Sequence, residues 1–179
     1  DHMEHFEGEE ELVECFRRFM TQAKRVVYGA DDPRARREGS AVRDAVSFGF
    51  AADARVRAVE IEERRDATAF TVRRDGEPVG RVMLPVPGRH NVLNALASVA
   101  VGLELGCRFE ALRDGLARFT PARRRFERVL EGVITVISDY AHHPTEIAAL
   151  VKTAVPLRKR RLVAIFQPHR FTRTRALGP

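Results

Sequence analysis

Residues 45–84 carry four successive strand-like segments with no helical pattern between them, and this run limits the fold more than any other feature. The segments cover residues 46–50, 54–62, 69–73 and 79–84, and they are rich in β-branched and alternating apolar residues. Asp75-Gly76 separates the last two. This dipeptide favours a two-residue hairpin because both residues tolerate a positive φ. The run therefore predicts a small antiparallel sheet.

The segments on either side of this run alternate between strand and helix, as in an α/β layer. Residues 9–20 have the periodicity of an amphipathic helix, residues 24–28 are typical of a short strand, and Pro33 suits the first turn of a short helix. Two further helices are predicted C-terminal to the run, the first capped by Gly106 and the second stopped by Pro121. We expect these elements to form a parallel sheet with flanking helices.

A second strand–helix alternation begins near residue 130. The nearly continuous apolar run at 133–138 predicts a buried parallel strand, Pro144 opens an amphipathic helix, and residues 162–166 predict another buried strand. A further helix is expected from Phe171 onward. This β-α-β-α order is typical of a doubly wound, Rossmann-like unit.

The predicted fold class is therefore α/β: a parallel sheet with flanking helices and a small antiparallel sheet, followed by the start of a Rossmann-like domain. We place one domain at residues 1–129 and the next at residues 130–179. No apolar run is long enough to cross a bilayer, so we expect no membrane partner. Cys15 and Cys107 lie in apolar helical patterns, which predicts buried free thiols in a reducing cytoplasm.

The net charge of +6 permits three interpretations: a nucleic-acid partner, an anionic substrate or a solvated basic surface. The basic runs at 123–125 and 158–161 lack the interleaved aromatic side chains that stack on bases. We therefore expect no nucleic-acid partner. The sequence leaves the oligomeric state open.

Three polar segments are candidates for a site. Asn91 and Asn94 are three residues apart and share a face of a helix's first turn. An amide can donate and accept hydrogen bonds at once, which is what an adenine edge requires. Helix capping is the simpler alternative. Residues 138–146 hold Asp139, two histidines and a helix start beyond a predicted strand, the position at which open α/β sheets bind ligands. Residues 166–175 place arginines at another helix start, where two guanidinium forks can hold a carboxylate.

Five segments, in order along the chain, resemble the Mur ligase family: residues 1–3, 88–95, 124–127, 139–146 and 166–174. Each is short, and their order is what makes the likeness specific. The resemblance implies an ATP-dependent ligase of peptidoglycan precursor synthesis in the cytoplasm, with Mg²⁺ and with ATP as co-substrate. The last segment is most similar to the member that joins L-alanine to UDP-N-acetylmuramate through an acyl phosphate.

The resemblance also implies roles for individual residues. It places Asn91, Asn94, Arg125 and Asp139 at the ATP site, with the two amides towards adenine and Arg125 towards the phosphates. His2 corresponds to the magnesium ligand. It places four further residues towards the amino acid and the acyl phosphate: His142, His169, Arg170 and Arg173. Of all these residues, Arg125 and His142 are expected to take part in catalysis.

The chain departs from the family pattern in three places. Ser138 stands where a second Asp is usual, and Pro121-Ala122 where Gly and an apolar residue are usual. No G-x-x-G-K-[ST] phosphate loop occurs in the 179 residues. We therefore expect an excerpt of a longer protein that is inactive alone. Two other functions stay open: a ligase that recycles a tripeptide onto UDP-N-acetylmuramate, and a non-catalytic basic module that binds nucleic acid.

Overall fold

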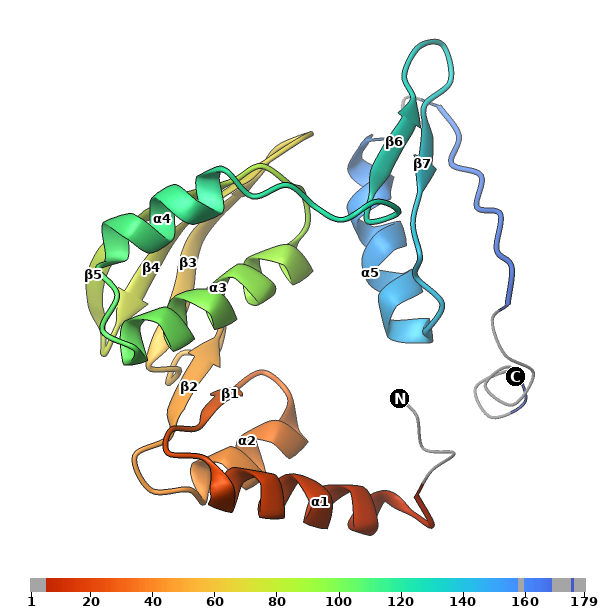
Figure 1. Ribbon diagram of the computed structural model, residues 1–179. Coiled ribbons are helices and arrows are strands. Elements are labelled where there is room, and N and C mark those ends of the chain that lie inside the picture. The colour runs from red at the N-terminus through yellow and green to blue at the C-terminus, as the bar shows by residue number, and fades with distance from the viewer. Residues whose placement is uncertain (1–5, 158–159, 169–174, 176–179) are drawn as a thin grey trace. The chain divides into compact units, whose positions relative to one another are not determined.

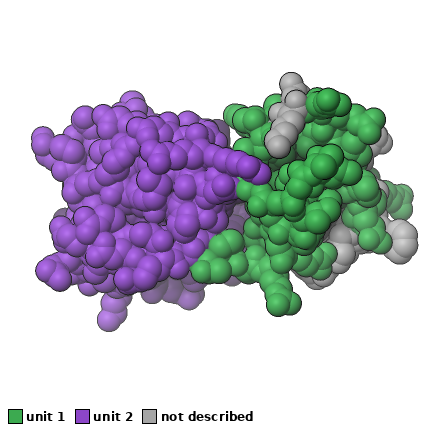
Figure 2. Space-filling model, turned by 90° about the horizontal axis from the view of Figure 1, so that it is seen from above, with its two compact units in different colours: residues 1–4, 120–179 green, residues 5–119 purple. Residues whose placement is uncertain are grey.

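The computed structural model describes residues 6–157, 160–168 and 175 (Figure 1). The chain forms two compact units that divide between Phe119 and Thr120 (Figure 2), and each is described by itself. The domain boundary that we expect between residues 129 and 130 stays a prediction.

One mixed sheet organises the first unit, with its five strands in chain order. The strands are β1 (Val27–Gly29), β2 (Val46–Gly49), β3 (Val56–Glu63), β4 (Thr68–Arg74) and β5 (Glu77–Leu84). β1, β2 and β3 are parallel, whereas β3, β4 and β5 are antiparallel. The predicted α/β class is confirmed. The structure adds that the antiparallel strands continue the parallel sheet through β3, because β3 pairs with β2 on one edge and with β4 on the other.

The hairpin predicted at Asp75-Gly76 joins β4 to β5, and the Arg74–Glu77 pair closes it. Asp75 has φ 50° and Gly76 has φ 91°. Positive φ at both central residues is the backbone that matches the twist of the two strands. The local sequence therefore determines this turn.

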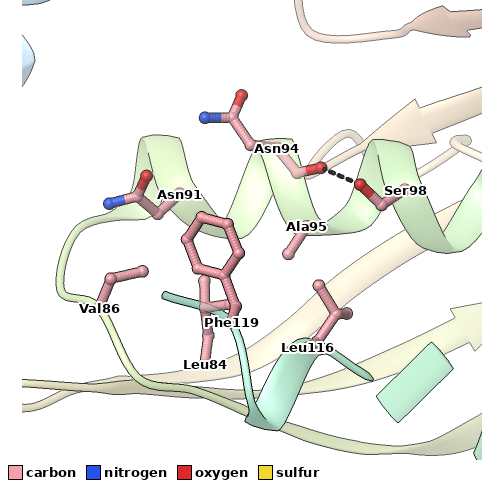
Figure 3. Close-up of a pocket in the computed structure, with 8 residues that line it drawn as sticks. All are labelled: Leu84, Val86, Asn91, Asn94, Ala95, Ser98, Leu116 and Phe119. Carbon is pink, nitrogen blue, oxygen red and sulfur yellow. Dashed lines mark hydrogen bonds between the residues drawn. The ribbon is translucent and has the colours of Figure 1, made fainter. Parts of the chain in front are cut away.

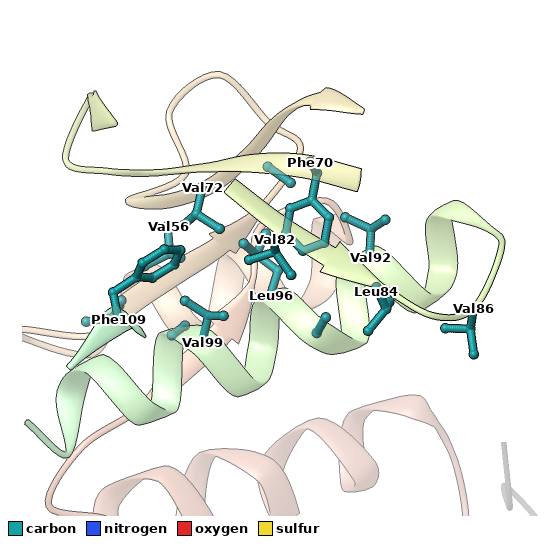
Figure 4. Packing of buried hydrophobic residues seen from close by; sticks show 14 residues of the cluster. Val56, Phe70, Val72, Val82, Leu84, Val86, Val92, Leu96, Val99 and Phe109 are labelled. Carbon is teal, nitrogen blue, oxygen red and sulfur yellow. The ribbon is translucent and has the colours of Figure 1, made fainter. Parts of the chain in front are cut away.

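Helices α3 (Arg89–Glu104) and α4 (Phe109–Ala117) cover one face of the sheet and enclose the core (Figure 4). Phe70, Leu96 and Val99 are fully buried between the two layers. Gly106, with φ 81°, ends α3 in a Schellman motif: its N–H donates to Leu103 O and the next N–H donates to Gly102 O. The capping predicted at Gly106 is confirmed.

The first helix, α1 (Glu9–Gln22), forms where the sequence predicts it but has no buried residue. Phe16 is 57% exposed and Phe19 is 68% exposed. Ion pairs connect α1 to α2 (Pro33–Ser40): Arg17 contacts Glu38 at 2.6 Å and Arg34 contacts Glu9 at 2.7 Å. The buried thiols predicted for both cysteines are wrong. Cys15 lies on this exposed helix and Cys107 follows the end of α3, so both are exposed and free.

The second unit holds a two-stranded antiparallel sheet, β6 (Glu127–Leu130) with β7 (Val136–Ser138), and helix α5 (Pro144–Ala154). The helix expected from Pro144 is confirmed. The buried parallel strand predicted at 133–138 is wrong, because β7 pairs with β6 in the antiparallel sense and Val133 is fully exposed.

The second buried strand, predicted at 162–166, is also wrong. Residues 161–168 are described but form no strand, and Ile165 is 96% exposed. A buried parallel strand pairs with a parallel neighbour and has both of its faces covered. Within the described part of the second unit, β7 has a strand only on its β6 edge. The helix predicted from Phe171 lies outside the described residues.

Candidate functional site

A pocket of about 120 Å³ lies beside α3 in the first unit (Figure 3). Apolar side chains from β5, α3 and α4 form its walls, and two amides and a hydroxyl add polar groups. The lining residues are Leu84, Val86, Asn91, Asn94, Ala95, Ser98, Leu116 and Phe119. Apolar walls with a few polar groups suit a flat heterocycle better than a charged ligand.

The two asparagines that the sequence singles out both line this pocket, which confirms that they share a face of α3. Asn91 is half-buried, and its Nδ2 donates to Pro87 O at 2.7 Å. A carbonyl only accepts hydrogen bonds, so this contact orients the amide and leaves Oδ1 as its acceptor. Asn94 is exposed one turn further along. The pocket therefore offers an oriented acceptor beside a solvent-facing amide.

A second group of polar residues lies where β7 ends, in the second unit. The Asp139 carboxylate accepts two backbone N–H groups at 2.7 Å each: Phe126 N–H on Oδ2 and Ala141 N–H on Oδ1. Tyr140 N–H donates to Arg124 O at 2.8 Å. The structure thus joins the arginine segment at 124–126 to the histidine segment at 140–143, which lie at the open end of the β6–β7 hairpin.

His142 lies at the start of α5, with its ring held by the backbone. Its Nδ1 is 2.7 Å from Tyr140 O, and its ring meets the Tyr140 ring edge-on with centroids 4.9 Å apart. Because the carbonyl can only accept, Nδ1 carries the proton, and in the neutral ring the lone pair is on Nε2. His143 is the N-cap of α5, and Thr145 N–H donates to its Nδ1 at 3.4 Å.

Glu146 completes a capping box at this helix start. Its Oε2 accepts the N–H of His142 at 3.1 Å and that of His143 at 3.2 Å. Burial is the largest influence and raises the pKa of Glu146. The two N–H donors together with the charges of His142 and Arg125 outweigh it, so the net pKa lies below its ordinary value.

The lowered pKa of Glu146 predicts an acid-dependent loss of stability in the second unit. A carboxyl whose folded pKa is depressed contributes stability above its unfolded pKa, and that stability is lost as pH falls through the folded pKa. Thermal melts from neutral to acid pH should show a shallower loss for Glu146→Gln than for wild type, with the two curves converging at low pH. Glu110→Gln, on the exposed surface of α4, is the control. Parallel curves for wild type and Glu146→Gln would contradict this assignment.

Arg125 lies between two residues with left-handed backbone, Arg124 at φ 60° and Phe126 at φ 51°. Its side chain is exposed and makes no hydrogen bond or ion pair within the described ranges. An exposed guanidinium can bind an anion through charge-assisted hydrogen bonds. The structure thus brings Arg125, Asp139 and His142 into one neighbourhood.

Four residues of the predicted site lie outside the described residues: His2, His169, Arg170 and Arg173. Two residues of this neighbourhood, Tyr140 and Glu146, were given no role by the sequence. The spacing of Glu146, three residues after the N-cap, is the signal that could have found its capping role. No pattern in the sequence indicates that Phe119 lines the pocket, because its position there depends on the packing of α4 beside α3.

No three His, Cys, Asp or Glu side chains gather as a metal site among the residues that the structure describes. The predicted magnesium ligand His2 is not among them. The longest described helix has 16 residues, and none combines the length and hydrophobicity that a bilayer crossing requires.

The mixed five-stranded sheet, with α3 and α4 covering one face, defines a protein of the α/β class. The chain belongs to the Mur ligase family. The Mur ligase middle domain matches residues 1–102, and the Mur ligase glutamate ligase domain matches residues 124–178.

Two relatives in sequence and one solved structure illustrate this membership. The chain is 46% identical to UDP-N-acetylmuramate–L-alanine ligase of Nitratidesulfovibrio vulgaris over 99% of the chain and 40% of that protein. It is 49% identical to the ligase of the same name from Salinibacter ruber over 80% of the chain and 31% of that protein. The solved structure of UDP-N-acetylmuramate-alanine ligase from Thermotoga maritima matches with a TM-score of 0.81 and 31% sequence identity. The match covers 99% of this chain and 41% of the Thermotoga maritima chain.

Proposed function

We propose that the full-length protein joins L-alanine to UDP-N-acetylmuramate at the expense of ATP, in peptidoglycan precursor synthesis in the cytoplasm. The observation that carries this proposal is the 46% identity to a ligase of that name over almost the whole chain. The chain spans about 40% of the length of that relative. Because the 179 residues contain no phosphate loop, we expect the chain by itself not to turn over.

The proposed chemistry solves one difficulty, which is that a free carboxylate is a poor acyl donor. The muramate carboxylate attacks the γ-phosphorus of ATP and ADP leaves, giving an acyl phosphate. The amine of L-alanine then attacks the acyl carbon, phosphate leaves, and the nitrogen loses a proton. Catalysis of such steps is mainly positioning and neutralisation of charge.

We assign the nucleotide base to the pocket beside α3. Asn91 Oδ1 is oriented as an acceptor by the Pro87 contact, and the 6-amino group of adenine is a donor. Asn94 lines the same pocket and supplies a second amide. Leu116 and Phe119 offer an apolar surface for the faces of the ring.

We assign the phosphates to Arg125, whose exposed guanidinium suits an anion, with Asp139 in the same nucleotide-binding role. His142 is the proposed general base for the amine, because its Nδ1 proton is committed to Tyr140 O and its Nε2 can accept a proton. His169, Arg170 and Arg173 are proposed to bind the amino acid and the acyl phosphate.

We also propose that Mg²⁺ accompanies ATP and that His2 is one of its ligands. A bound Mg²⁺ would neutralise phosphate charge during the transfer. The proposal for the metal rests on the family resemblance alone.

Phosphate release by the full-length protein, measured with UDP-N-acetylmuramate, L-alanine and Mg-ATP, tests the function. We expect release that depends on all three substrates. Replacing L-alanine with the L-alanyl-γ-D-glutamyl-diaminopimelate tripeptide tests the recycling ligase, and faster turnover of the tripeptide would overturn the assignment of L-alanine. Turnover by the 179-residue chain alone would contradict the expectation that the missing phosphate loop is needed.

A further inference from the structure

The backbone on both sides of Arg125 is held in a conformation that non-glycine residues rarely adopt. Arg124 and Phe126 both have left-handed φ, at 60° and 51°. Such residues persist only where surrounding contacts determine the conformation, and they concentrate at functional sites. Something in the fold must therefore keep this three-residue segment from relaxing.

The Asp139 carboxylate supplies the central contact. Its Oδ2 accepts Phe126 N–H at 2.7 Å, while its Oδ1 accepts Ala141 N–H at the same distance. Around it, Arg124 O accepts Tyr140 N–H at 2.8 Å and Arg124 N–H donates to Glu127 Oε2 at 2.7 Å. The Arg124 guanidinium lies over the Tyr140 ring, 5.0 Å from its centroid. The segment is thus held by its backbone and by Arg124, and none of these contacts uses the Arg125 side chain.

We propose that Asp139 is a positioning residue for Arg125. Its carboxylate holds the segment in the conformation in which Arg124 and Phe126 are left-handed, and this conformation presents the Arg125 guanidinium to the phosphates of a bound nucleotide. The role rests on the proposed function, and it changes the part given to Asp139: it acts on the nucleotide through Arg125 rather than by direct contact. Pre-positioning of this kind lowers the entropic cost of forming a charge-assisted contact.

A double-mutant cycle in the full-length protein tests this role. Asp139→Asn keeps the side-chain size, but an amide nitrogen cannot accept an N–H, so one of the two backbone contacts is lost. ATP and adenosine are the probes, titrated calorimetrically against wild type, Asp139→Asn, Arg125→Ala and the double variant. We expect Asp139→Asn to weaken ATP about tenfold and to leave adenosine unchanged. In the Arg125→Ala background, Asp139→Asn should change ATP affinity less than about twofold.

Two outcomes of the cycle would overturn the positioning role. They are an equal loss for adenosine and ATP, or a full effect of Asp139→Asn in the Arg125→Ala background; either means that Asp139 contacts the nucleotide directly. A wild-type protein that binds neither probe would overturn the proposed function and this role with it. A failed cycle in a protein that binds ATP normally would overturn only this role. Hydrogen exchange of the backbone amides of α5 should be the same in Asp139→Asn and wild type, which shows that the unit holding Asp139 is folded in the variant.

Backbone strain supplies a second measurement. Glycine adopts a positive φ without cost, so in an Arg124→Gly background the segment needs less holding, and Asp139→Asn should weaken ATP less than it does in wild type. Arg124→Ala is the matched control, because it also removes the guanidinium but keeps the Cβ that makes the conformation costly. Equal effects of Asp139→Asn in the two backgrounds would contradict the holding role.

Discussion

Arg125→Ala in the full-length protein is expected to lower kcat/KM by about 10²- to 10³-fold, the usual cost of removing one group that stabilises developing charge. The melting temperature should be close to that of wild type, because the side chain is exposed and makes no hydrogen bond or ion pair in the described part of the chain. Steady-state phosphate release and a thermal melt on the same preparations measure the two effects.

Two arginine variants sharpen this experiment. Arg123→Ala removes a neighbouring exposed arginine with no assigned role, and its kcat/KM should equal that of wild type. Arg125→Lys keeps the charge but loses the planar fork, so it should recover only part of the activity. An unchanged kcat/KM in Arg125→Ala would remove Arg125 from the site.

Phe70→Ala is expected to destabilise the first unit by about 3–5 kcal/mol, the range for truncating a large aromatic side chain in a core. Phe70 is 0% exposed and lies in the cluster between the sheet and α3. Hydrogen exchange of the backbone amides of β3, β4 and β5, followed in urea, reports on this unit separately from the second one.

Phe19→Ala is the control for the core variant, since the same side chain is 68% exposed on α1. Its stability should stay within about 0.5 kcal/mol of wild type, as is usual for surface positions. Equal losses in the two variants would mean that Phe70 is not part of a close-packed core.

Features that depend on neighbouring residues could be predicted from the sequence. The turn at Asp75-Gly76 requires only that both residues accept a positive φ, and both do. The end of α3 at Gly106 depends on the same freedom one residue past the helix. The placing of Asn91 and Asn94 on one face follows from helical periodicity, and both line the pocket.

Features that depend on distant residues could not be predicted in this way. The apolar run at 133–138 has the composition of a buried strand, yet Val133 is fully exposed, because burial requires neighbouring elements that residue 133 itself does not specify. The contact between Asp139 and the Phe126 backbone arises only when β6 and β7 pair. The sequence by itself thus determined local conformation and the family, through backbone sterics and residue periodicity. Only the tertiary structure decided which segments pair, which side chains are buried and what the Asp139 carboxylate holds, since each of these depends on contacts between segments far apart in the chain.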